Sequence, residues 1–323
     1  MKKFEKKFEK ISKAKKPIVV THNDADGAMA AWLMKQAVPA AQIVFSAAPA
    51  AQVDAAITTA LEEGADAIVI TDCSPSSVMA EKLDCMEIEK LLVDHHKTAE
   101  YLNKYSWAEV KPLKDGNSAI SEYRGIKLID ECAASNVCTI LQNEGIKFNE
   151  EVKNFITVVN INDMWQFDRI HELEPLTEEF MDYNRVFYRT SLEDFIANPK
   201  FTISPEDKLI LQGIKETEDN FISSLVEYAT YTEIDGIPAV RIRTAGRFNM
   251  SKLTLSLLKK FPEHNLFVYE NAVSISLRVR KGAGIDAGAI AKKYGGGGHA
   301  AAAGIPIPEN LQDVAFNATL KRI

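Results

Sequence analysis

Aspartates and histidines follow three apolar segments that have the composition of buried strands. They are His22, Asp24 and Asp26 after the first segment, Asp72 after the third, and Asp94, His95 and His96 after the fourth. Asp163 is a further candidate, because it interrupts a stretch with an apolar helical pattern. Buried carboxylates at such short separation ionise together only when cations neutralise them. Carboxylates mixed with imidazoles, without thiolates, suit Mn²⁺, Mg²⁺ or Co²⁺.

These residues offer more ligands than one ion needs. Two ions bridged by one carboxylate would use them all, as in two-metal hydrolysis of phosphoesters. Each residue also has a plain alternative: Asp24 or Asp26 as a turn or helix-capping residue before Gly27, Asp72 as a cap of the next helix, and a histidine with a structural hydrogen bond. The joint occurrence at corresponding strand ends favours the metal site.

The elements that would position these residues alternate between strand and helix. The predicted strands are Pro17–Val20, Gln42–Phe45, Ala67–Ile70 and Leu91–Val93, and the helices between them are Ala28–Ala37, Ala50–Glu63 and Pro75–Leu83. This alternation predicts a parallel α/β sheet, in which ligands bind beyond the carboxyl ends of the strands. From Asp130 to Gln166 the pattern is helical.

The second half of the chain has a different pattern. A helix from Pro205 to Tyr228 is expected to connect two domains, and hairpin signals lie around Asp235-Gly236 and Glu270-Asn271. A helix over Asp286–Tyr294 and a final helix complete a smaller α/β domain. The predicted boundaries are residues 1–195 for the first domain, 196–229 for the connector and 230–323 for the second domain, with a cleft between the domains.

The stretch "GGGGHAAAAG", from Gly295 to Gly304, is a second candidate for ligand binding. Its N–H groups could form an anion-binding nest beside His299, and the alternative is a flexible loop. It follows a helix instead of a strand, so a dinucleotide-binding fold is excluded. Arg278 or Arg280, just upstream, could grip a phosphate, or either could form a surface salt bridge.

The composition narrows the function classes. Of the 323 residues, 46% are hydrophobic and 26% charged, which suits two domains with buried cores. The net charge of −7 argues against binding of long nucleic acid, but it is compatible with a small anionic ligand. No apolar run is long enough to span a membrane. The four cysteines form no CxxC pair, which favours reduced thiols and a cytoplasmic location.

The lysine-rich N-terminus lacks the apolar core of a signal peptide. Phe4, Phe8 and Ile11 have helical spacing, so we expect a short amphipathic helix packed on the body of the protein. A surface patch for anions or membranes is the alternative.

Four short motifs together resemble those of a known family. "HNDADG", "TDCS", "VDHH" and "NINDMW" occur in the order of motifs I to IV of the DHH phosphoesterase superfamily. "SISLRV" and "GIDAGAIAKKYGGGGHAAAAG" are similar to the signature of the associated DHHA1 domain. The resemblance covers nearly the entire chain. It implies a metal-dependent phosphohydrolase, usually activated by manganese, in which a parallel-sheet DHH domain is followed by a smaller DHHA1 domain.

The resemblance also implies roles for individual residues. One ion would be held by His22, Asp24 and Asp72, and the second by Asp26, Asp72, His95 and Asp163. His96 would face the scissile phosphate, Asp94 would orient a histidine, and both count as catalytic with Asp72. Substrate contacts would come from Arg278, Gly296, Gly297, Gly298 and His299, and from Ser135 and Asn136 on a helix that lines the cleft.

Within this superfamily, the glycine stretch argues against the pyrophosphatases, and the length leaves no room for the extra domains of RecJ-type enzymes. We therefore expect a manganese-dependent phosphodiesterase of the nanoRNase type. It would hydrolyse very short 5′-phosphorylated oligoribonucleotides or linear dinucleotides to mononucleotides by a two-metal mechanism. A 3′,5′-bisphosphate nucleotide phosphatase, a RecJ-like single-strand exonuclease and a catalytically inactive nucleotide sensor are the alternatives. The oligomeric state stays open, with a homodimer among the options.

Overall fold

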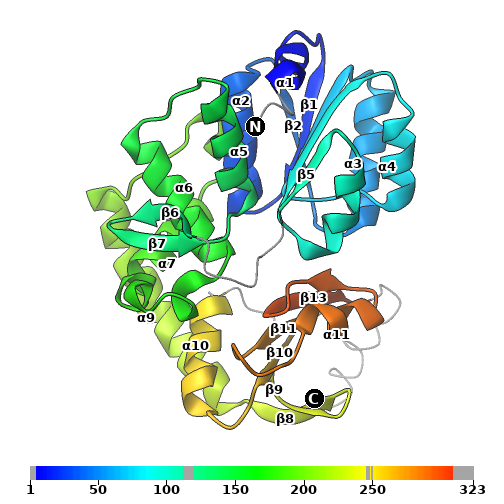
Figure 1. Ribbon diagram of the computed structural model, residues 1–323. Helices are drawn as coiled ribbons and strands as arrows, with labels where there is room; N and C mark the ends of the chain where they lie inside the picture. The colour runs from blue at the N-terminus through cyan, green and yellow to red at the C-terminus, as the bar shows by residue number, and fades with distance from the viewer. Residues whose placement is uncertain (1–4, 112–118, 245–247, 249, 308–323) are drawn as a thin grey trace. The chain divides into compact units, whose positions relative to one another are not determined.

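The computed structural model describes residues 5–111, 119–244, 248 and 250–307 (Figure 1). The chain divides into two compact units, Met1–Lys208 and Leu209–Ile323. Each unit has its own sheet and its own hydrophobic core. The mixed α/β fold class predicted from the sequence is confirmed.

The first unit contains a five-stranded sheet whose strands are all parallel, in the order β2-β1-β3-β4-β5. The strands are β1 (Pro17–His22), β2 (Gln42–Ser46), β3 (Ala67–Thr71), β4 (Glu89–Asp94) and β5 (Ala108–Val110). The four predicted strands are confirmed, each one or more residues longer. Because the chain leaves β1 toward β2 and returns to add β3 on its other side, the order reverses between β1 and β3. Ligands of open α/β sheets bind at such a switch point.

Helices cover both faces of this sheet (Figure 1). They are α2 (Ala25–Ala37), α3 (Ala50–Glu62), α4 (Ser77–Asp84), η1 (Lys97–Lys104), α5 (Ala133–Asn143) and α6 (Glu150–Asp163). Strand side chains alternate between the two layers: Val19 and Val69 pack with α2, α5 and α6, whereas Ile18 and Ile68 pack with α3 and α4.

The helical stretch predicted from Asp130 to Gln166 is two helices. Gly145 follows α5 with a φ of 87°, a left-handed conformation that terminates the helix. Asn149 is the N-cap of α6, and its side chain accepts a hydrogen bond from Val152 N at 2.9 Å. A hairpin of β6 (Ala119–Tyr123) and β7 (Ile126–Ile129) precedes α5. After α6 come η2 (Gln166–Asp168), η3 (His171–Leu176), α7 (Thr177–Phe187) and α8 (Leu192–Ala197). Phe180 of α7 is fully buried in a core that includes residues of α6, which fixes α7 beside α6.

The second unit is built on a six-stranded sheet in the order β12-β13-β11-β10-β9-β8. Its elements are α9 (Pro205–Glu227), which begins in the first unit, β8 (Thr230–Ile234), β9 (Ile237–Arg243), α10 (Met250–Lys260), β10 (Leu266–Glu270), β11 (Ser274–Val279), α11 (Ala287–Lys293), β12 (Gly297–Gly298) and β13 (Ala302–Pro306). The predicted hairpin at Asp235-Gly236 is confirmed, and both residues have positive φ (51° and 78°), as its tight turn requires. The predicted final helix lies outside the described residues.

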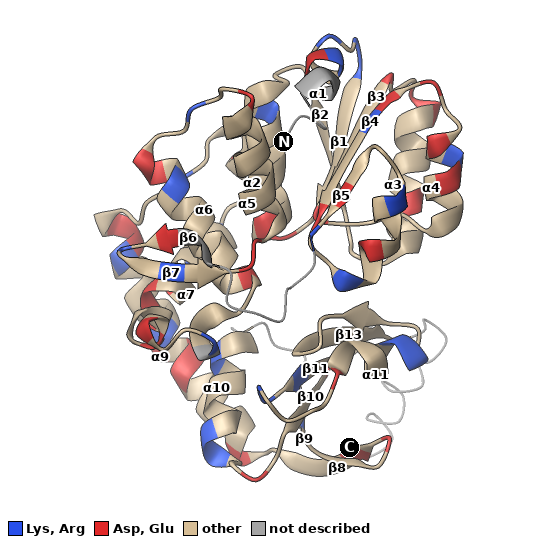
Figure 2. Cartoon of the chain, viewed as in Figure 1, with Lys and Arg blue, Asp and Glu red and all other residues tan. Residues whose placement is uncertain are grey.

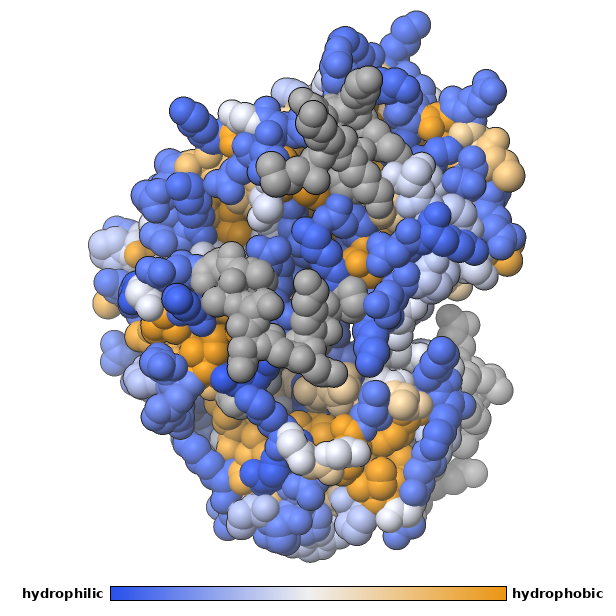
Figure 3. Space-filling model, viewed as in Figure 1, coloured by the Kyte–Doolittle hydropathy of each residue, from blue (hydrophilic) through white to orange (hydrophobic). Residues whose placement is uncertain are grey.

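The charged residues of both units are interspersed in sign along the ribbons of Figure 2, with no continuous basic face among the described residues on this view. The surface in Figure 3 is mostly hydrophilic. In the described part of the chain, no helix combines the length and the apolar character that crossing a membrane requires.

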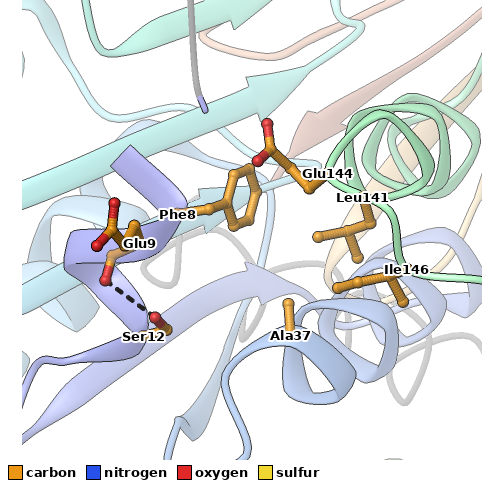
Figure 4. A pocket seen from close by; sticks show the side chains of 7 residues that line it. All are labelled: Phe8, Glu9, Ser12, Ala37, Leu141, Glu144 and Ile146. Carbon is orange, nitrogen blue, oxygen red and sulfur yellow. Dashed lines mark hydrogen bonds between the residues drawn. The ribbon is translucent and has the colours of Figure 1, made fainter. Parts of the chain in front are cut away.

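The N-terminal helix α1 (Glu5–Ser12) packs on the first unit as expected, with Phe8 and Ile11 buried. Phe4 lies outside the described residues. A pocket of about 280 Å³ lies between α1 and the ends of α2 and α5 (Figure 4). It is lined by Phe8, Glu9, Ser12, Ala37, Leu141, Glu144 and Ile146. None of these residues belongs to the predicted site.

Candidate metal centre

The turn from β1 into α2 holds His22 and Asp24 together. Asp24 is the N-cap of α2, since its Oδ1 accepts a hydrogen bond from Gly27 N at 3.0 Å, and its Oδ2 lies 2.8 Å from His22 Nδ1. A Cβ at position 27 would meet His22 O at 2.2 Å, so only glycine lets the helix start this close to the strand. The capping role considered for Asp24 is therefore real and coexists with a place in the cluster.

Asp26 is almost fully buried, at 1% exposure, and contacts a distant part of the sequence. Its two carboxylate oxygens accept hydrogen bonds from Ala133 N and Ala134 N, both at 2.8 Å. These are the first residues of α5, where backbone N–H groups have no partner within the helix. Asp26 thus anchors the start of α5 against the start of α2.

Asp72 lies directly after β3, in the centre of the cluster. Its φ of 55° is in the left-handed region, which is unusual for a residue other than glycine. Its Oδ1 lies 3.2 Å from His95 Nε2, and its Oδ2 lies 3.6 Å from His22 Nδ1. The alternative that Asp72 caps the next helix is wrong, because Ser76 caps α4 by accepting from Met79 N at 3.2 Å.

The two adjacent histidines after β4 have different surroundings. His95 is fully buried, and its Nε2 lies 3.7 Å from Asp26 Oδ2 and 3.4 Å from Asp163 Oδ2. The side chain of His96 is 26% exposed, and its Nδ1 lies 2.7 Å from Asp94 Oδ1. Asp94 also accepts hydrogen bonds from His95 N at 2.7 Å and from the Ser74 hydroxyl. This arrangement is what the predicted orienting role of Asp94 requires.

Asp163 is the last residue of α6, and its side chain reaches the cluster. The helix ends there because Trp165 adopts a left-handed conformation, with φ 45°. Asp163 Oδ2 is buried and accepts no hydrogen bond from any described residue, and the same holds for Asp72 Oδ2. Two buried anionic oxygens without donors are costly, and a cation would satisfy both.

The electrostatics of the cluster agree with this geometry. Burial, followed by the charges of the neighbouring aspartates, raises the pKa of Asp72 and of Asp163 well above the usual range. Burial alone would lower the pKa of His96, but the charge of Asp94 and its hydrogen bond raise that pKa to about 9. The carboxylates therefore ionise together only when positive charge is added.

The described residues form groupings whose ligand atoms lie within 4.8 Å of one another. Those within the first unit are His22, Asp24 and Asp72; Asp26, His95 and Asp163; and Asp72, Asp94, His95 and His96. These oxygen and nitrogen donors, with no thiolate among them, fit divalent cations such as Mn²⁺ or Mg²⁺. The structure thus brings together every residue predicted as a metal ligand, while the assignment of each one to an ion stays a prediction.

The glycine stretch of the second unit has a packing function. A Cβ on Gly296 would meet Gly304 O at 2.0 Å, and one on Gly298 would meet Ala302 O at 2.6 Å. Both glycines therefore allow β12 to approach β13. Of the three glycines predicted to bind substrate, only Gly297 has open space where a Cβ would lie. The backbone N–H of His299 donates to Ala302 O at 2.7 Å.

Arg278 on β11 and Arg280 just after this strand make different contacts. Arg280 donates to Leu258 O and Phe261 O, both at 3.2 Å, and so caps the C-terminal end of α10. Arg278 lies on β11 and donates to Leu277 O at 2.9 Å. Arg280 therefore has a structural role, which leaves Arg278 as the candidate for a phosphate.

The residues of α5 fit the predicted substrate contacts less well. Asn136 is fully buried, and its amide donates to Cys132 O at 3.0 Å, while its buried Oδ1 has no hydrogen-bond partner among the described residues. Its contact with the substrate stays a prediction. Ser135 is half-buried, and its Oγ lies 3.6 Å from Cys132 Sγ.

Sequence reasoning missed Asn184 and Tyr188. Both lie at the end of α7 and line a cavity of about 180 Å³ together with Asp24, Asp26 and Asp163. The segment containing α7 has no clear hydrophobic period, and a lone amide and a lone phenol carry no motif, so the sequence offered no signal for them.

Comparison with known proteins identifies the family of this chain. Residues 16–161 match the sequence model of the DHH family, N-terminal domain, and residues 249–323 match that of the DHHA1 domain. The two matches together cover more than half of the chain. The chain therefore belongs to the DHH/DHHA1 superfamily of phosphoester hydrolases, as the sequence motifs indicated.

Among curated proteins, the chain is similar to oligoribonuclease NrnB of Bacillus subtilis (strain 168), with 26% identity over 264 residues. The alignment covers 77% of this chain and 61% of that protein, so the chain spans about three fifths of its relative. Among solved structures, exonuclease RecJ bound to manganese has a TM-score of 0.60 at 15% identity, covering 98% of this chain and 93% of the other. RecJ in complex with Mn²⁺ from Thermus thermophilus has a TM-score of 0.55 at 14% identity, with 100% and 55% covered. These structures share the fold.

Proposed function

We propose that this protein is a manganese-dependent phosphodiesterase of the nanoRNase type. It hydrolyses very short 5′-phosphorylated oligoribonucleotides or linear dinucleotides to mononucleotides with two metal ions. The family supports phosphoester hydrolysis, and the relative named oligoribonuclease supports a short RNA substrate. The observation that carries the proposal is the position of Asp72 between two groups of ligands.

Asp72 directs one carboxylate oxygen toward each group. Its Oδ1 faces His95, which lies in the group with Asp26 and Asp163, and its Oδ2 faces His22 of the other group. One carboxylate in this position can bridge two cations. Bound there, the cations would neutralise the carboxylates, activate a water molecule and hold the phosphoryl oxygens.

The remaining residues would position the substrate and supply a proton. The Asp94 carboxylate accepts the Nδ1 proton of His96, which fixes the ring so that Nε2 is directed away from Asp94. In this orientation His96 would contact the scissile phosphate and protonate the leaving oxygen. From the second unit, Arg278, Gly297 and His299 would bind the terminal phosphate or nucleotide.

The test is turnover with Mn²⁺ on a matched set of substrates. The set contains 5′-phosphorylated diribonucleotides, a five-nucleotide RNA, a long single-stranded DNA, adenosine 3′,5′-bisphosphate and pyrophosphate. We expect the diribonucleotides to be the best substrates and Asp72→Asn to abolish their hydrolysis. Glu62→Gln, an exposed change at the end of α3, is the matched control and should be fully active.

The other outcomes distinguish the alternatives. Hydrolysis of the bisphosphate alone would indicate a nucleotide phosphatase, and degradation of the long strand a RecJ-like exonuclease. Metal binding without hydrolysis of any substrate would indicate a nucleotide sensor. Full activity of Asp72→Asn would contradict the two-metal arrangement.

A further inference from the structure

A polar cavity of about 180 Å³ lies directly beside the metal centre, within the first unit. It is lined by Asp24, Ala25, Asp26, Val159, Asn162, Asp163, Asn184 and Tyr188. The three aspartates belong to the predicted metal ligands, so a group bound here would be a direct neighbour of the scissile phosphate. The cavity is too small for a dinucleotide and large enough for one part of a nucleotide.

The charge of the lining restricts which part that is. Apart from the three aspartates, every described lining residue is neutral, and no lysine or arginine is among them. The cations proposed above would balance the three aspartates, and the rest of the wall offers no lysine or arginine to hold a second phosphate. A neutral group with several hydroxyls, such as a ribose, matches the amide and phenol groups of the wall.

Asn184 and Tyr188 supply the part of this wall that can still donate a hydrogen bond, since the Tyr188 hydroxyl accepts one from the backbone N–H of Ala25. They are one helical turn apart at the end of α7, and Tyr188 N donates to Asn184 O at 3.0 Å. Within the described residues, the side-chain amide of Asn184 has no hydrogen-bond partner. The third polar residue, Asn162, instead donates to Val158 O at 3.0 Å and to Phe180 O at 3.2 Å.

Tyr188 joins the cavity by its hydroxyl end. The residue as a whole is 61% exposed, yet burial of the hydroxyl and the charges of Asp24 and Asp163 raise its pKa. A phenol carries its proton at neutral pH, so the hydroxyl of Tyr188 is available as a donor. The helix α7, which ends directly before Tyr188, packs on the unit through the fully buried side chain of Phe180, and Arg185 lies 2.7 Å from Asp182 on the same helix.

From these contacts we infer that Asn184 and Tyr188 recognise the 2′-hydroxyl of the ribose whose 3′-oxygen is bonded to the scissile phosphate. An amide offers both a donor and an acceptor, which matches a hydroxyl that is both, and this hydroxyl is what distinguishes RNA from DNA. The inference rests on the proposed function and adds the residues that determine its preference for ribonucleotides.

The test compares two substrates that differ in one atom. A 5′-phosphorylated diribonucleotide is paired with the analogue that lacks only that 2′-hydroxyl, and kcat/KM is measured for both with Mn²⁺. We expect Asn184→Ala to lower the ratio of the two values about tenfold, through loss of activity on the ribonucleotide. Tyr188→Phe, which removes only the hydroxyl, should lower the ratio about threefold.

Matched controls are available on the same chain. Asn143→Ala removes an exposed amide at the end of α5, and Tyr228→Phe removes the hydroxyl of a tyrosine that is 82% exposed. Both controls should keep the ratio of the parent protein. The rise in melting temperature with Mn²⁺ should be the same in all four variants, because none of them changes a metal ligand.

The outcomes separate the inference from the proposed function. An active parent protein with the same ratio in Asn184→Ala as in Asn143→Ala would overturn the inference alone. An equal loss on both substrates in Asn184→Ala would also overturn it, since this indicates a structural role. A parent protein that hydrolyses neither substrate would overturn the proposed function and the inference with it.

Discussion

Replacing Asp72 by asparagine tests the bridging position most directly, because the change keeps the shape and removes the charge. Asp72 belongs to the group with His22 and Asp24 and also to the group with Asp94, His95 and His96, whereas Asp163 belongs only to the group with Asp26 and His95. If each group binds one cation, Asp72→Asn should lose the stabilisation from both ions, and Asp163→Asn mainly that from one. Comparing the metal-dependent stabilisation that the two variants lose therefore distinguishes a bridging carboxylate from two separate sites.

The size of the effect follows from mass action. A ligand present at 100 times its dissociation constant stabilises the folded state by about 2.7 kcal/mol. Two ions would add about 5 kcal/mol, which for a chain of this size corresponds to a rise in melting temperature of the order of 10 °C. We expect Asp72→Asn to lose nearly all of this rise, Asp163→Asn about half, and the control Glu62→Gln none of it.

Without metal, the same substitution should act in the opposite direction. The folded state raises the pKa of Asp72 above its unfolded value, so the folded protein binds more protons and loses stability as pH rises through this range. Each unit of that shift costs about 1.4 kcal/mol at neutral pH. Asp72→Asn should therefore melt above the parent protein in chelator at pH 7, and the difference should shrink toward pH 4.

Differential scanning calorimetry in chelator and in Mn²⁺, at both pH values, measures these effects. A full manganese-dependent rise in Asp72→Asn would refute the bridge. A metal-free Asp72→Asn that melts below the parent protein at pH 7 would refute the electrostatic argument.

Three further predictions concern residues around the site. Gly27→Ala should destabilise the first unit by about 1–3 kcal/mol, because its Cβ would lie 2.2 Å from His22 O, and calorimetry would measure it. Ser74→Ala removes a hydrogen bond to Asp94 and should lower kcat about tenfold with unchanged manganese affinity; an unchanged kcat would contradict this role. Arg278→Ala should raise KM for 5′-phosphorylated substrates with little loss of stability. Arg280→Ala should lower the melting temperature and leave KM unchanged. The reverse pattern would contradict both assignments.

Much of the first unit could be predicted because its signals are local. Each buried strand is a short apolar run, and each ligand follows its strand directly, so periodicity and the rule for parallel sheets were enough to gather His22, Asp72 and His95 at one edge. Asp163 needed the family motif in addition, because a single aspartate at a helix end has several ordinary explanations.

The parts that the sequence did not predict depend on contacts between distant residues. Asp26 bonds the start of α5, more than one hundred residues away, and no local pattern contains that contact. The hydrogen bond from the Asn136 amide to the backbone of Cys132 was also not predicted. Asn184 enters the site only because α7 packs against α6, in a segment without a clear hydrophobic period.

The local strain of the centre supports a function for it. Asp72 has an unfavourable backbone conformation and a buried oxygen without a donor among the described residues, and Asp163 has a second such oxygen. Such features cost free energy in the folded state and persist where the surrounding structure holds them. Here the rigid elements that hold them are β3, β4 and the paired starts of α2 and α5. A fold that served only structural needs would gain stability by replacing these aspartates, so their presence at one strand edge is best explained by the cations that they would bind.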